Sequence, residues 1–462
     1  MNEMVFDSIV IGAGQAGPSL AVTLANRGEK VALIETDRLG GTCINNGCTP
    51  TKTLRKSARV AYLARRASEF GVETGPIRVD FGKAMARMRE RVDTSRAGLD
   101  GWVRGNGVAV FSGHGRIAGR DGDAYRVTVG DQVIRAAKLF LNTGTRPFMP
   151  PIPGLAEVPA LDNRSLLGLD TLPRHLVIIG GSYIGLEMAQ IFRRLGAEVS
   201  VIEGGPALAS REDPDISAMI REFLEAEGIA VHTGVKIQGV SGEAGTITVQ
   251  LEGTDVTGSH LLVATGRIPN TDDLGLETID LQTGPRGHID TNHRLETAVP
   301  SIWALGDING RGAFTHTSYH DFEIVAENLA GGTRSADDRV MAYAMFTDPP
   351  LGHVGIHRYE AQKLADEGRN ILIAEHDMKD VSRAKEESEL TGRIRIIVDG
   401  ADGAVLGATI LGINGDEIVQ TFSNFIAAGG HWINMRDALP VHPTVTEFMP
   451  TILAKLKPLL RS

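Results

Sequence analysis

Two cysteines are the residues of this sequence with the clearest capacity for chemistry. The 462-residue chain contains only Cys43 and Cys48, and both lie in GTCINNGCTPTK, residues 41–52. A structural zinc site needs about four ligands, and no other cysteine or histidine lies close by in the sequence. Two inert buried thiols are one interpretation of such a pair, and reversible dithiol–disulfide exchange is the other. The flanking residues and the rest of the chain decide between them.

The spacing of the two cysteines predicts different roles for them. Positions i and i+5 are about 500° apart on a regular helix, so the side chains would diverge, and Gly47 permits the irregular turn that a disulfide needs. Thr49 and Pro50 are residue types preferred at a helix N-cap and first helical position. Cys48 is therefore expected just before a helix N-terminus, where the dipole lowers a thiol pKa. We predict that Cys48 is the thiolate and that Cys43 attacks the substrate.

Length and composition restrict the class of protein. A chain of 462 residues is too long for one core and predicts about three domains. The net charge of −10 gives no electrostatic case for a nucleic-acid partner. The apolar stretch at residues 7–24 contains three glycines and lacks a basic start, so we expect no signal peptide. No apolar run reaches the roughly 18 residues of a membrane span. We therefore expect a cytoplasmic protein without a membrane partner, in which a cysteine pair is more often catalytic than structural.

An internal repeat organises the first half of the chain. The segment IVIGAGQAG, residues 9–17, matches VIIGGSYIG, residues 177–185, and the match continues without a gap to Glu35 and Glu203. Each copy has an apolar strand, a glycine turn, a helix, a second strand and a terminal acid. In dinucleotide-binding units these parts make the tight turn, the approach to the pyrophosphate and the contact with a ribose hydroxyl. The repeat predicts two dinucleotide sites; two ordinary glycine turns are the disfavoured alternative.

The two sites are assigned from their positions in the chain. The first copy leads into Gly41, Thr42 and Cys43, so FAD is expected beside the cysteines and a nicotinamide in the second copy. Ser182 replaces the middle glycine of the second copy, which departs from the pattern. A free 2′-hydroxyl favours a carboxylate and a 2′-phosphate favours arginine, so Glu203 favours NADH over NADPH. A surface glutamate at a strand end is the alternative interpretation of Glu203.

The segment GGTCINNGCTPTK, residues 40–52, closely resembles the active-site segment of the class I pyridine nucleotide-disulfide oxidoreductases, which include glutathione reductase, dihydrolipoamide dehydrogenase and mercuric reductase. Further segments resemble the cofactor-binding and interface motifs of that family: LNTGTRP at 141–147, VATGRIPN at 263–270, IWALGD at 302–307 and FTDPP at 346–350. LDNRS at 161–165 and REDP at 211–214 are similar to its mercuric-reductase-like branch. The resemblance covers almost the whole chain.

The resemblance implies a role for each candidate residue. Cys43 would exchange with the substrate and Cys48 would contact the flavin. Lys52 would lie near the flavin ring, paired with Glu187. Tyr183 would cover the flavin until the nicotinamide displaces it, with a packed aromatic ring as the alternative. The remaining cofactor-binding candidates are Gly12, Gly14, Gly17, Glu35, Gly41, Thr42, Gly115, Thr143, Gly144, Gly180, Gly185, Glu203, Gly266, Asp307 and His316.

One histidine near the C-terminus is suited to moving protons. His442 precedes a proline and is expected to be extended, and imidazole is suited to protonating a departing thiolate. Thr444 and Glu447 have the spacing of a capping box, which is a structural interpretation of Glu447. The sequence also resembles the family's HPT..E signature. That resemblance implies a His442–Glu447 pair that serves the cysteines of the partner subunit, and hence a homodimer.

We therefore predict an α/β protein with two Rossmann-like dinucleotide-binding domains and a C-terminal α+β dimerisation domain. The predicted boundaries are 1–146 for the FAD domain, 147–267 for the NAD(P) domain, 268–336 for a central domain returning to FAD, and 337–462 for the dimerisation domain. No resident metal site is predicted.

The predicted activity is electron transfer from NADH through FAD to a redox-active Cys43–Cys48 disulfide. The substrate stays open among lipoamide, a low-molecular-weight thiol and a protein disulfide. Reduction of a mercuric or cupric ion by the same centre is the first alternative. A non-catalytic nucleotide-binding sensor or scaffold is the second, and it is disfavoured because a scaffold needs neither the cysteine pair nor the His442–Glu447 pair.

Overall fold

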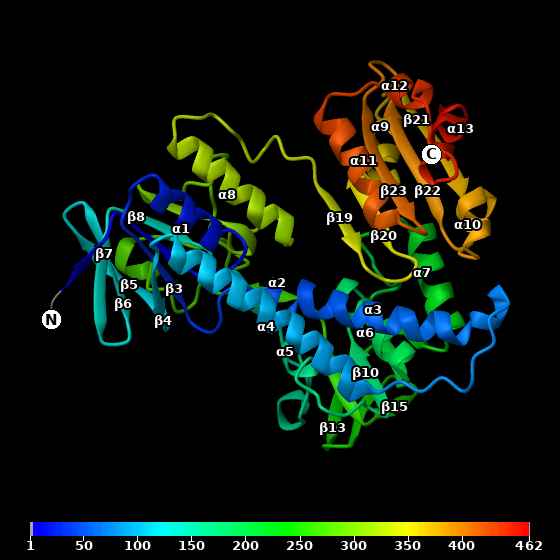
Figure 1. The fold of residues 1–462 in the computed structure, drawn as a ribbon, viewed down its shortest axis with the longest axis horizontal. Helices are drawn as coiled ribbons and strands as arrows, with labels where there is room; N and C mark the ends of the chain where they lie inside the picture. The colour runs from blue at the N-terminus through cyan, green and yellow to red at the C-terminus, as the bar shows by residue number, and fades with distance from the viewer. Residues whose placement is uncertain (1–2, 462) are drawn as a thin grey trace.

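A computed structural model describes residues 3–461 and shows three units, each built on a sheet (Figure 1). Residues 1–2 and 462, the outer ends of the predicted first and last domains, lie outside the described residues. The predicted α/β class, with two dinucleotide-binding units and a C-terminal α+β unit, is confirmed.

The first unit contains a five-stranded parallel sheet in the order β18-β8-β2-β3-β4. Because side chains alternate along a strand, Val10 and Leu33 pack under helices on one face while Ile9 and Ile34 pack against a second sheet on the other. The parallel strands are β2 (Ser8–Ile11), β3 (Val31–Glu35), β4 (Ala109–Ser112), β8 (Lys138–Leu141) and β18 (Ile302–Ala304). The helices are α1 (Gly17–Asn26) and α8 (Thr315–Leu329), and the second sheet holds β1 (Met4–Val5), β5 (Gly115–Asp121), β6 (Ala124–Val129) and β7 (Gln132–Ala136).

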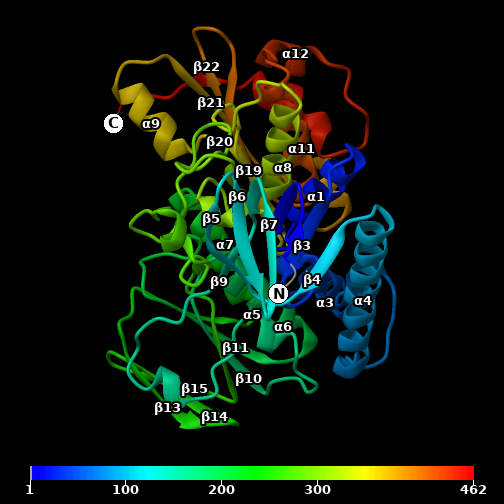
Figure 2. The same ribbon diagram turned by 90° about the vertical axis from the view of Figure 1, so that its left-hand side faces the viewer.

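The second unit repeats these layers. Its four-stranded parallel sheet has the order β12-β11-β10-β16, with Ile178 facing helices and Val177 facing an antiparallel sheet. The parallel strands are β10 (His175–Ile179), β11 (Glu198–Glu203), β12 (Ala230–Thr233) and β16 (His260–Val263), and the helices are α6 (Tyr183–Leu195) and α7 (Pro214–Ala226). The antiparallel sheet, β13 (Ile237–Glu243), β14 (Thr246–Leu251) and β15 (Asp255–Gly258), lies at the end of the molecule opposite the C-terminal unit (Figure 2). The internal sequence repeat thus corresponds to two units with the same arrangement of a parallel sheet, helices and an additional sheet.

The C-terminal unit is a six-stranded antiparallel sheet with helices on both faces. Ile396 belongs to the core under α11 (Gly415–Ala427), α12 (Trp432–Asp437) and α13 (Met449–Leu453), and Ile397 to the core under α9 (Arg358–Asp366). The strands are β19 (Ala342–Met345), β20 (Leu351–Gly355), β21 (Ile371–Asp377), β22 (Arg393–Asp399), β23 (Val405–Leu411) and β24 (Lys457–Pro458).

Helices after the first glycine loop connect the first two units. α2 (Gly41–Asn46), α3 (Cys48–Arg65) and α4 (Phe81–Gly105) follow one another, and Leu54 of α3 and Met85 of α4 share a core with Phe192 of α6. α3 and α6 lie side by side. The short strands β9 (Thr145–Pro147) and β17 (Arg267–Pro269) pair where the chain leaves and re-enters the first unit. The boundaries at 146 and 267 fall in this pairing and stay predictions.

Shorter elements complete the fold: α5 (Asn163–Leu166), α10 (Ser382–Glu386), and the 3-10 helices Ala67–Phe70, Leu155–Glu157, Leu276–Ile279, Gly306–Asn309, Met378–Asp380 and Thr446–Phe448. Within residues 3–461, no helix combines the length and the apolar character needed to cross a membrane.

Candidate active site

Cys43 and Cys48 lie on two helices separated by a sharp break. Cys43 is in α2, which ends at Gly47, and α3 begins directly at Cys48. The predicted helix start is wrong by two residues: the N-cap is Gly47 rather than Thr49, and the first helical residue is Cys48 rather than Pro50, which is the third. Gly47 takes this place because a Cβ atom there would lie only 2.9 Å from the Thr42 carbonyl oxygen. Cys48 is therefore the first residue of α3 and belongs to the first turn of the helix.

The two thiols differ in acidity. Both are free in this structure, and Cys48 Sγ lies 3.1 Å from Thr315 Oγ1. A hydrogen bond from Cys43 lowers the pKa of Cys48 to about 6, and the Thr315 hydroxyl and the Lys52 charge assist it against the opposing effect of burial. The same hydrogen bond, together with burial, raises the pKa of Cys43. Above about pH 6, the pair is one thiolate, Cys48, and one thiol, Cys43.

Lys52 and Glu187 form an ion pair beside the cysteines. Lys52 is one turn after Cys48 on α3, and its Nζ lies 2.7 Å from Glu187 Oε2. Glu187 is only 7% exposed, and its Oε1 accepts a hydrogen bond from the Phe346 amide at 2.8 Å. Lys52 Nζ also lies 4.2 Å from the centroid of the Phe346 ring. The structure thus joins these two predicted residues, and it fixes a positive charge next to the thiolate.

The two glycine-rich loops have the same close backbone contact. A Cβ atom on Gly17 would lie 2.2 Å from the Gly12 carbonyl oxygen, and one on Gly185 would lie 2.1 Å from the Gly180 carbonyl oxygen. Only glycine lets the helix approach the preceding strand so closely, which leaves the helix N-terminus free for a pyrophosphate. Ser182, the departure from the pattern, is the N-cap of α6. Both loops fit a dinucleotide.

The acids that end the two repeats make equivalent hydrogen bonds. Glu35 accepts from the backbone amides of Ala13 and Asp37, at 2.8 and 2.9 Å. Glu203 accepts from the equivalent amides at positions 181 and 205, at 2.7 Å each. Each carboxylate is therefore fixed beside its glycine loop by backbone amides, at the position from which a dinucleotide-binding unit contacts a ribose hydroxyl.

The other motifs converge beside α2. Asp307 Oδ2 accepts a hydrogen bond from Thr145 Oγ1 at 2.9 Å, and Arg267 donates to the same hydroxyl at 2.8 Å and to Thr42 Oγ1 at 3.4 Å. Burial raises the pKa of Asp307. A half-buried carboxylate beside a hydroxyl group is suited to accepting hydrogen bonds from a cofactor's hydroxyl groups.

Three predicted glycines lie at turns or contacts around the first loop. Gly41 packs on Gly14, since a Cβ on Gly41 would lie 2.8 Å from the Gly14 Cα atom. Gly144 follows β8, and Gly115 begins β5 against the side chains of Ile11 and Ile34. Close packing therefore accounts for Gly41 and Gly115, whereas a Cβ atom on Gly144 would meet no atom within 4 Å.

Three further candidates make hydrogen bonds or lie after a strand. Thr143 Oγ1 donates to the Asn270 carbonyl at 2.9 Å, and Gly266 follows β16. His316 Nε2 lies 2.6 Å from the Ala342 carbonyl oxygen, so this nitrogen is engaged by the strand that opens the C-terminal sheet. Burial lowers the pKa of His316.

His442 and Glu447 form a hydrogen-bonded pair in the C-terminal unit. His442 Nδ1 lies 2.7 Å from Glu447 Oε2. The capping-box interpretation is only half correct: the Glu447 amide donates to Thr444 Oγ1 at 3.1 Å, but the carboxylate binds His442. Figure 1 shows α13, which follows this pair, on the far side of the C-terminal unit from α2.

Sequence reasoning missed several residues that complete the site. Asn142 is buried, accepts from the Gly17 amide at 3.0 Å and donates to the Leu305 carbonyl at 2.7 Å. Thr315 contacts Cys48 although no spacing rule relates two residues 267 positions apart. Asn142 lies within the recognised segment at 141–147, and Thr315 is adjacent to the candidate His316. These neighbours were the only signals in the sequence that could have pointed to the two residues.

Comparisons with known proteins agree with this geometry. The sequence model for pyridine nucleotide-disulphide oxidoreductases matches residues 6–321, and the model for the dimerisation domain of the same enzymes matches residues 341–452. The chain is 32% identical over 458 residues to the probable pyridine nucleotide-disulfide oxidoreductase RclA of Escherichia coli (strain K12), covering 98% of this chain and 99% of that protein. It is 34% identical over 440 residues to a mercuric reductase of Streptomyces lividans, covering 92% and 90%.

The fold has close counterparts among solved structures. A Cu(II) complex of the HOCl-induced flavoprotein disulfide reductase RclA from Escherichia coli aligns with a TM-score of 0.88 at 32% identity, covering 98% of this chain and 99% of that one. Members of the family are enzymes that use FAD and NAD(P)H, with a redox-active cysteine pair. Two complete dinucleotide-binding units, a polarised cysteine pair and a matched dimerisation domain place this chain among the pyridine nucleotide-disulphide oxidoreductases.

Proposed function

We propose that this enzyme uses NADH to reduce the Cys43–Cys48 disulfide and that the resulting dithiol reduces a disulfide substrate. The observation that carries the proposal is the polarisation of the pair, with the pKa of Cys48 lowered to about 6 and that of Cys43 raised. FAD, when bound at the first loop, would supply the relay of an electron pair from the nicotinamide to the disulfide. Glu35, Asp307 and Lys52 would hold it.

The exchange with substrate is a balanced two-step reaction. Cys43 loses its proton to the imidazole of His442 and its sulfur bonds to one sulfur of the substrate disulfide, while the other substrate sulfur leaves and takes the proton. The Cys48 thiolate then attacks the Cys43 sulfur of the mixed disulfide, which forms the Cys43–Cys48 disulfide and releases the second substrate sulfur as a thiolate that takes a proton from water. The low pKa of Cys48 supports this order because the resolving thiol is already ionised.

We further propose that His442 acts on the cysteines of a second copy in a homodimer. The match to the dimerisation domain supports this proposal. So does the exposure of the segment around His442, where Leu439 is 96% and Val441 74% exposed. Exposed apolar side chains of this kind are typical of interaction surfaces. A cytoplasmic location is part of the proposal, since reducing compartments maintain free thiols.

Reduction of a metal ion is the second candidate function. One solved structure of a relative is a Cu(II) complex, and another relative is a mercuric reductase. The same thiolate–thiol pair would bind a soft metal ion. NADH oxidation that depends on a cupric or mercuric ion and survives the change His442→Gln would favour this function over disulfide exchange.

The first experiment is an anaerobic titration of the purified holoenzyme with NADH, and separately with NADPH, followed by the flavin absorption spectrum. A long-wavelength thiolate–flavin band that disappears in Cys48→Ser supports the electron relay through the cysteines. Bleaching of the flavin without that band means that electrons leave the flavin directly and contradicts the proposal.

A further inference from the structure

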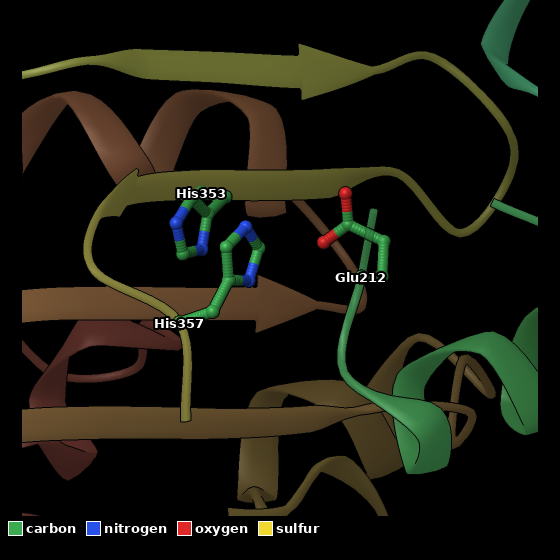
Figure 3. Close-up of side chains that lie close together, drawn as sticks. All are labelled: Glu212, His353 and His357. Atoms are coloured by element: carbon green, nitrogen blue, oxygen red, sulfur yellow. The ribbon is translucent and has the colours of Figure 1, made fainter. Parts of the chain in front are cut away.

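Three ligand-type side chains, Glu212, His353 and His357, lie together where the second unit meets the C-terminal sheet (Figure 3). All three are buried, and one polar atom of each lies within 4.8 Å of the others. Their composition would suit zinc or copper, but their geometry does not. The two imidazole rings stack with centroids 3.7 Å apart and planes 4° apart. Lone pairs lie in the ring planes, so parallel rings cannot direct them at one ion.

The cluster is instead one end of a hydrogen-bond series that reaches Tyr183. The Tyr183 hydroxyl donates to Glu212 Oε1, and the Tyr343 hydroxyl donates to the same oxygen at 2.9 Å. His357 Nε2 lies 2.9 Å from the Tyr343 oxygen. Since the Tyr343 hydrogen is directed at Glu212, Nε2 of His357 carries a hydrogen and donates. Burial raises the pKa of both tyrosines, which keeps them neutral donors.

Glu212 is held in place from both sides. Its amide donates to the Ala209 carbonyl at 2.8 Å, and the Ala209 amide donates to the carbonyl of Gly181, in the second glycine loop, at 2.7 Å. The next residue, Asp213, accepts from Arg395 of β22 at 2.6 Å. The carboxylate is therefore fixed between the dinucleotide loop and the C-terminal sheet. If the Tyr183 ring moves, Glu212 does not follow, and the hydrogen bond breaks.

Tyr183 lies on α6 between the second glycine loop and Glu187. It is the first residue of α6, directly after the glycine loop, and it precedes Glu187 by one turn. Glu187 binds Lys52 beside the cysteines. A nicotinamide bound at the second loop would reach the cysteine region past the Tyr183 side chain.

We propose that Glu212 is a positioning residue for the nicotinamide: it holds the Tyr183 phenol in its resting place, and the nicotinamide enters by breaking this hydrogen bond. The inference rests on the proposed function, because it requires a nicotinamide at the second loop. A hydrogen bond to a buried carboxylate is among the stronger hydrogen bonds in proteins. Because the nucleotide must break this bond to enter, the bond should weaken nucleotide affinity by a measurable factor. Glu212 acts only through Tyr183 and does not touch the reacting atoms.

The test is the affinity of the oxidised holoenzyme for NAD+, measured by calorimetry without turnover. Tyr183→Phe removes the donor and Glu212→Leu removes the acceptor, and each is expected to tighten NAD+ binding by about tenfold. The double variant is expected to match Glu212→Leu, because each single change already breaks the bond between Tyr183 and Glu212. Glu212→Leu also removes the acceptor of the Tyr343 hydroxyl, and the Tyr343→Phe variant measures that loss by itself. Glu212→Gln retains an acceptor oxygen and is expected to restore most of the wild-type affinity.

Tyr343→Phe is the matched control, because Tyr343 donates to the same oxygen but does not follow the glycine loop. We expect it to change NAD+ affinity less than twofold. Unchanged affinity in Tyr183→Phe, which keeps the ring and its packing, overturns the inference, and so do additive effects in the double variant. The proposed function is tested separately by the thiolate–flavin band of the wild-type enzyme. If the wild type shows that band but Tyr183→Phe binds NAD+ with unaltered affinity, the proposed function stands and only the role of Glu212 is wrong.

Discussion

His442 Nδ1 lies 2.7 Å from Glu447 Oε2, while the His442 side chain is 77% exposed and that of Glu447 is 12% exposed. The hydrogen bond directs the Nδ1 hydrogen at the carboxylate, which leaves Nε2 available for a proton from elsewhere. An oriented imidazole with so much exposed surface is arranged to act on a group outside its own chain, which agrees with a proposed site completed by a second subunit.

Replacing His442 tests this role. His442→Gln is expected to lower the rate of disulfide reduction by about 10²–10⁴-fold, the usual contribution of a positioned general acid–base. Glu447→Gln keeps an acceptor for Nδ1 and is expected to cause a smaller loss. Steady-state assays with a disulfide substrate measure both effects. The control is NADH-dependent reduction of ferricyanide, which accepts electrons from the flavin; an equal loss in that assay would contradict a role confined to sulfur exchange.

The acidity of Cys48 gives a prediction about pH. Its pKa is lowered to about 6, with the hydrogen bond from Cys43 as the largest cause. The reactive thiolate should therefore persist above about pH 6 and be lost as the pH falls through that value. Cys43→Ser keeps a hydroxyl donor and Cys43→Ala removes it, and each leaves Cys48 as the single thiol.

The rate of alkylation by iodoacetamide, measured against pH in these two variants, reports the ionisation of Cys48. The midpoint in Cys43→Ala is expected to lie above that in Cys43→Ser, by about one pH unit for the loss of a hydrogen bond near 1.4 kcal/mol. Coincident midpoints would show that the helix N-terminus and Lys52, rather than Cys43, set the acidity of Cys48.

The sequence predicted the parts of the site whose reasons are local. Gly17 and Gly185 are required by a contact within nine residues of chain, and Glu35 ends a strand whose register follows from the repeat. These expectations depend only on backbone geometry that every dinucleotide-binding loop shares. The start of α3 was placed wrongly because residue preferences at Thr49 and Pro50 were outweighed by the backbone break at Gly47.

Contacts between distant segments could not be predicted in this way. Thr315 reaches Cys48 because α8 and α3 meet beside the first glycine loop, and Glu212 receives hydroxyl groups from Tyr183 and Tyr343, which belong to different units. No periodicity or spacing relates such residues, since their proximity results from how the three sheets pack together. Only the folded chain shows that the Glu212 carboxylate joins Tyr183 of the second unit to Tyr343 of the C-terminal sheet.

The Lys52–Glu187 pair predicts an effect on stability. Lys52→Met leaves the Glu187 carboxylate buried with the Phe346 amide as its remaining donor, which should cost about 1–3 kcal/mol. The thermal unfolding midpoint should fall by about 1 °C for each kcal/mol, because the unfolding entropy scales with the length of the chain. The double variant Lys52→Met/Glu187→Leu removes the buried charge as well and is expected to recover part of the loss. A double variant less stable than Lys52→Met would contradict this account.

Glu203 predicts the choice of nicotinamide nucleotide. Its carboxylate is fixed by two amides beside the second loop, so a 2′-phosphate at the ribose would meet a negative charge. The wild-type enzyme is expected to prefer NADH. Glu203→Gln retains the shape and one acceptor oxygen, and removing the charge should lower the ratio of kcat/KM for NADH to kcat/KM for NADPH by about tenfold.

Glu35→Gln is the matched control at the equivalent position of the first repeat: it should weaken retention of FAD and leave that ratio unchanged. If Glu35→Gln alters the ratio and Glu203→Gln does not, the assignment of the two loops is reversed.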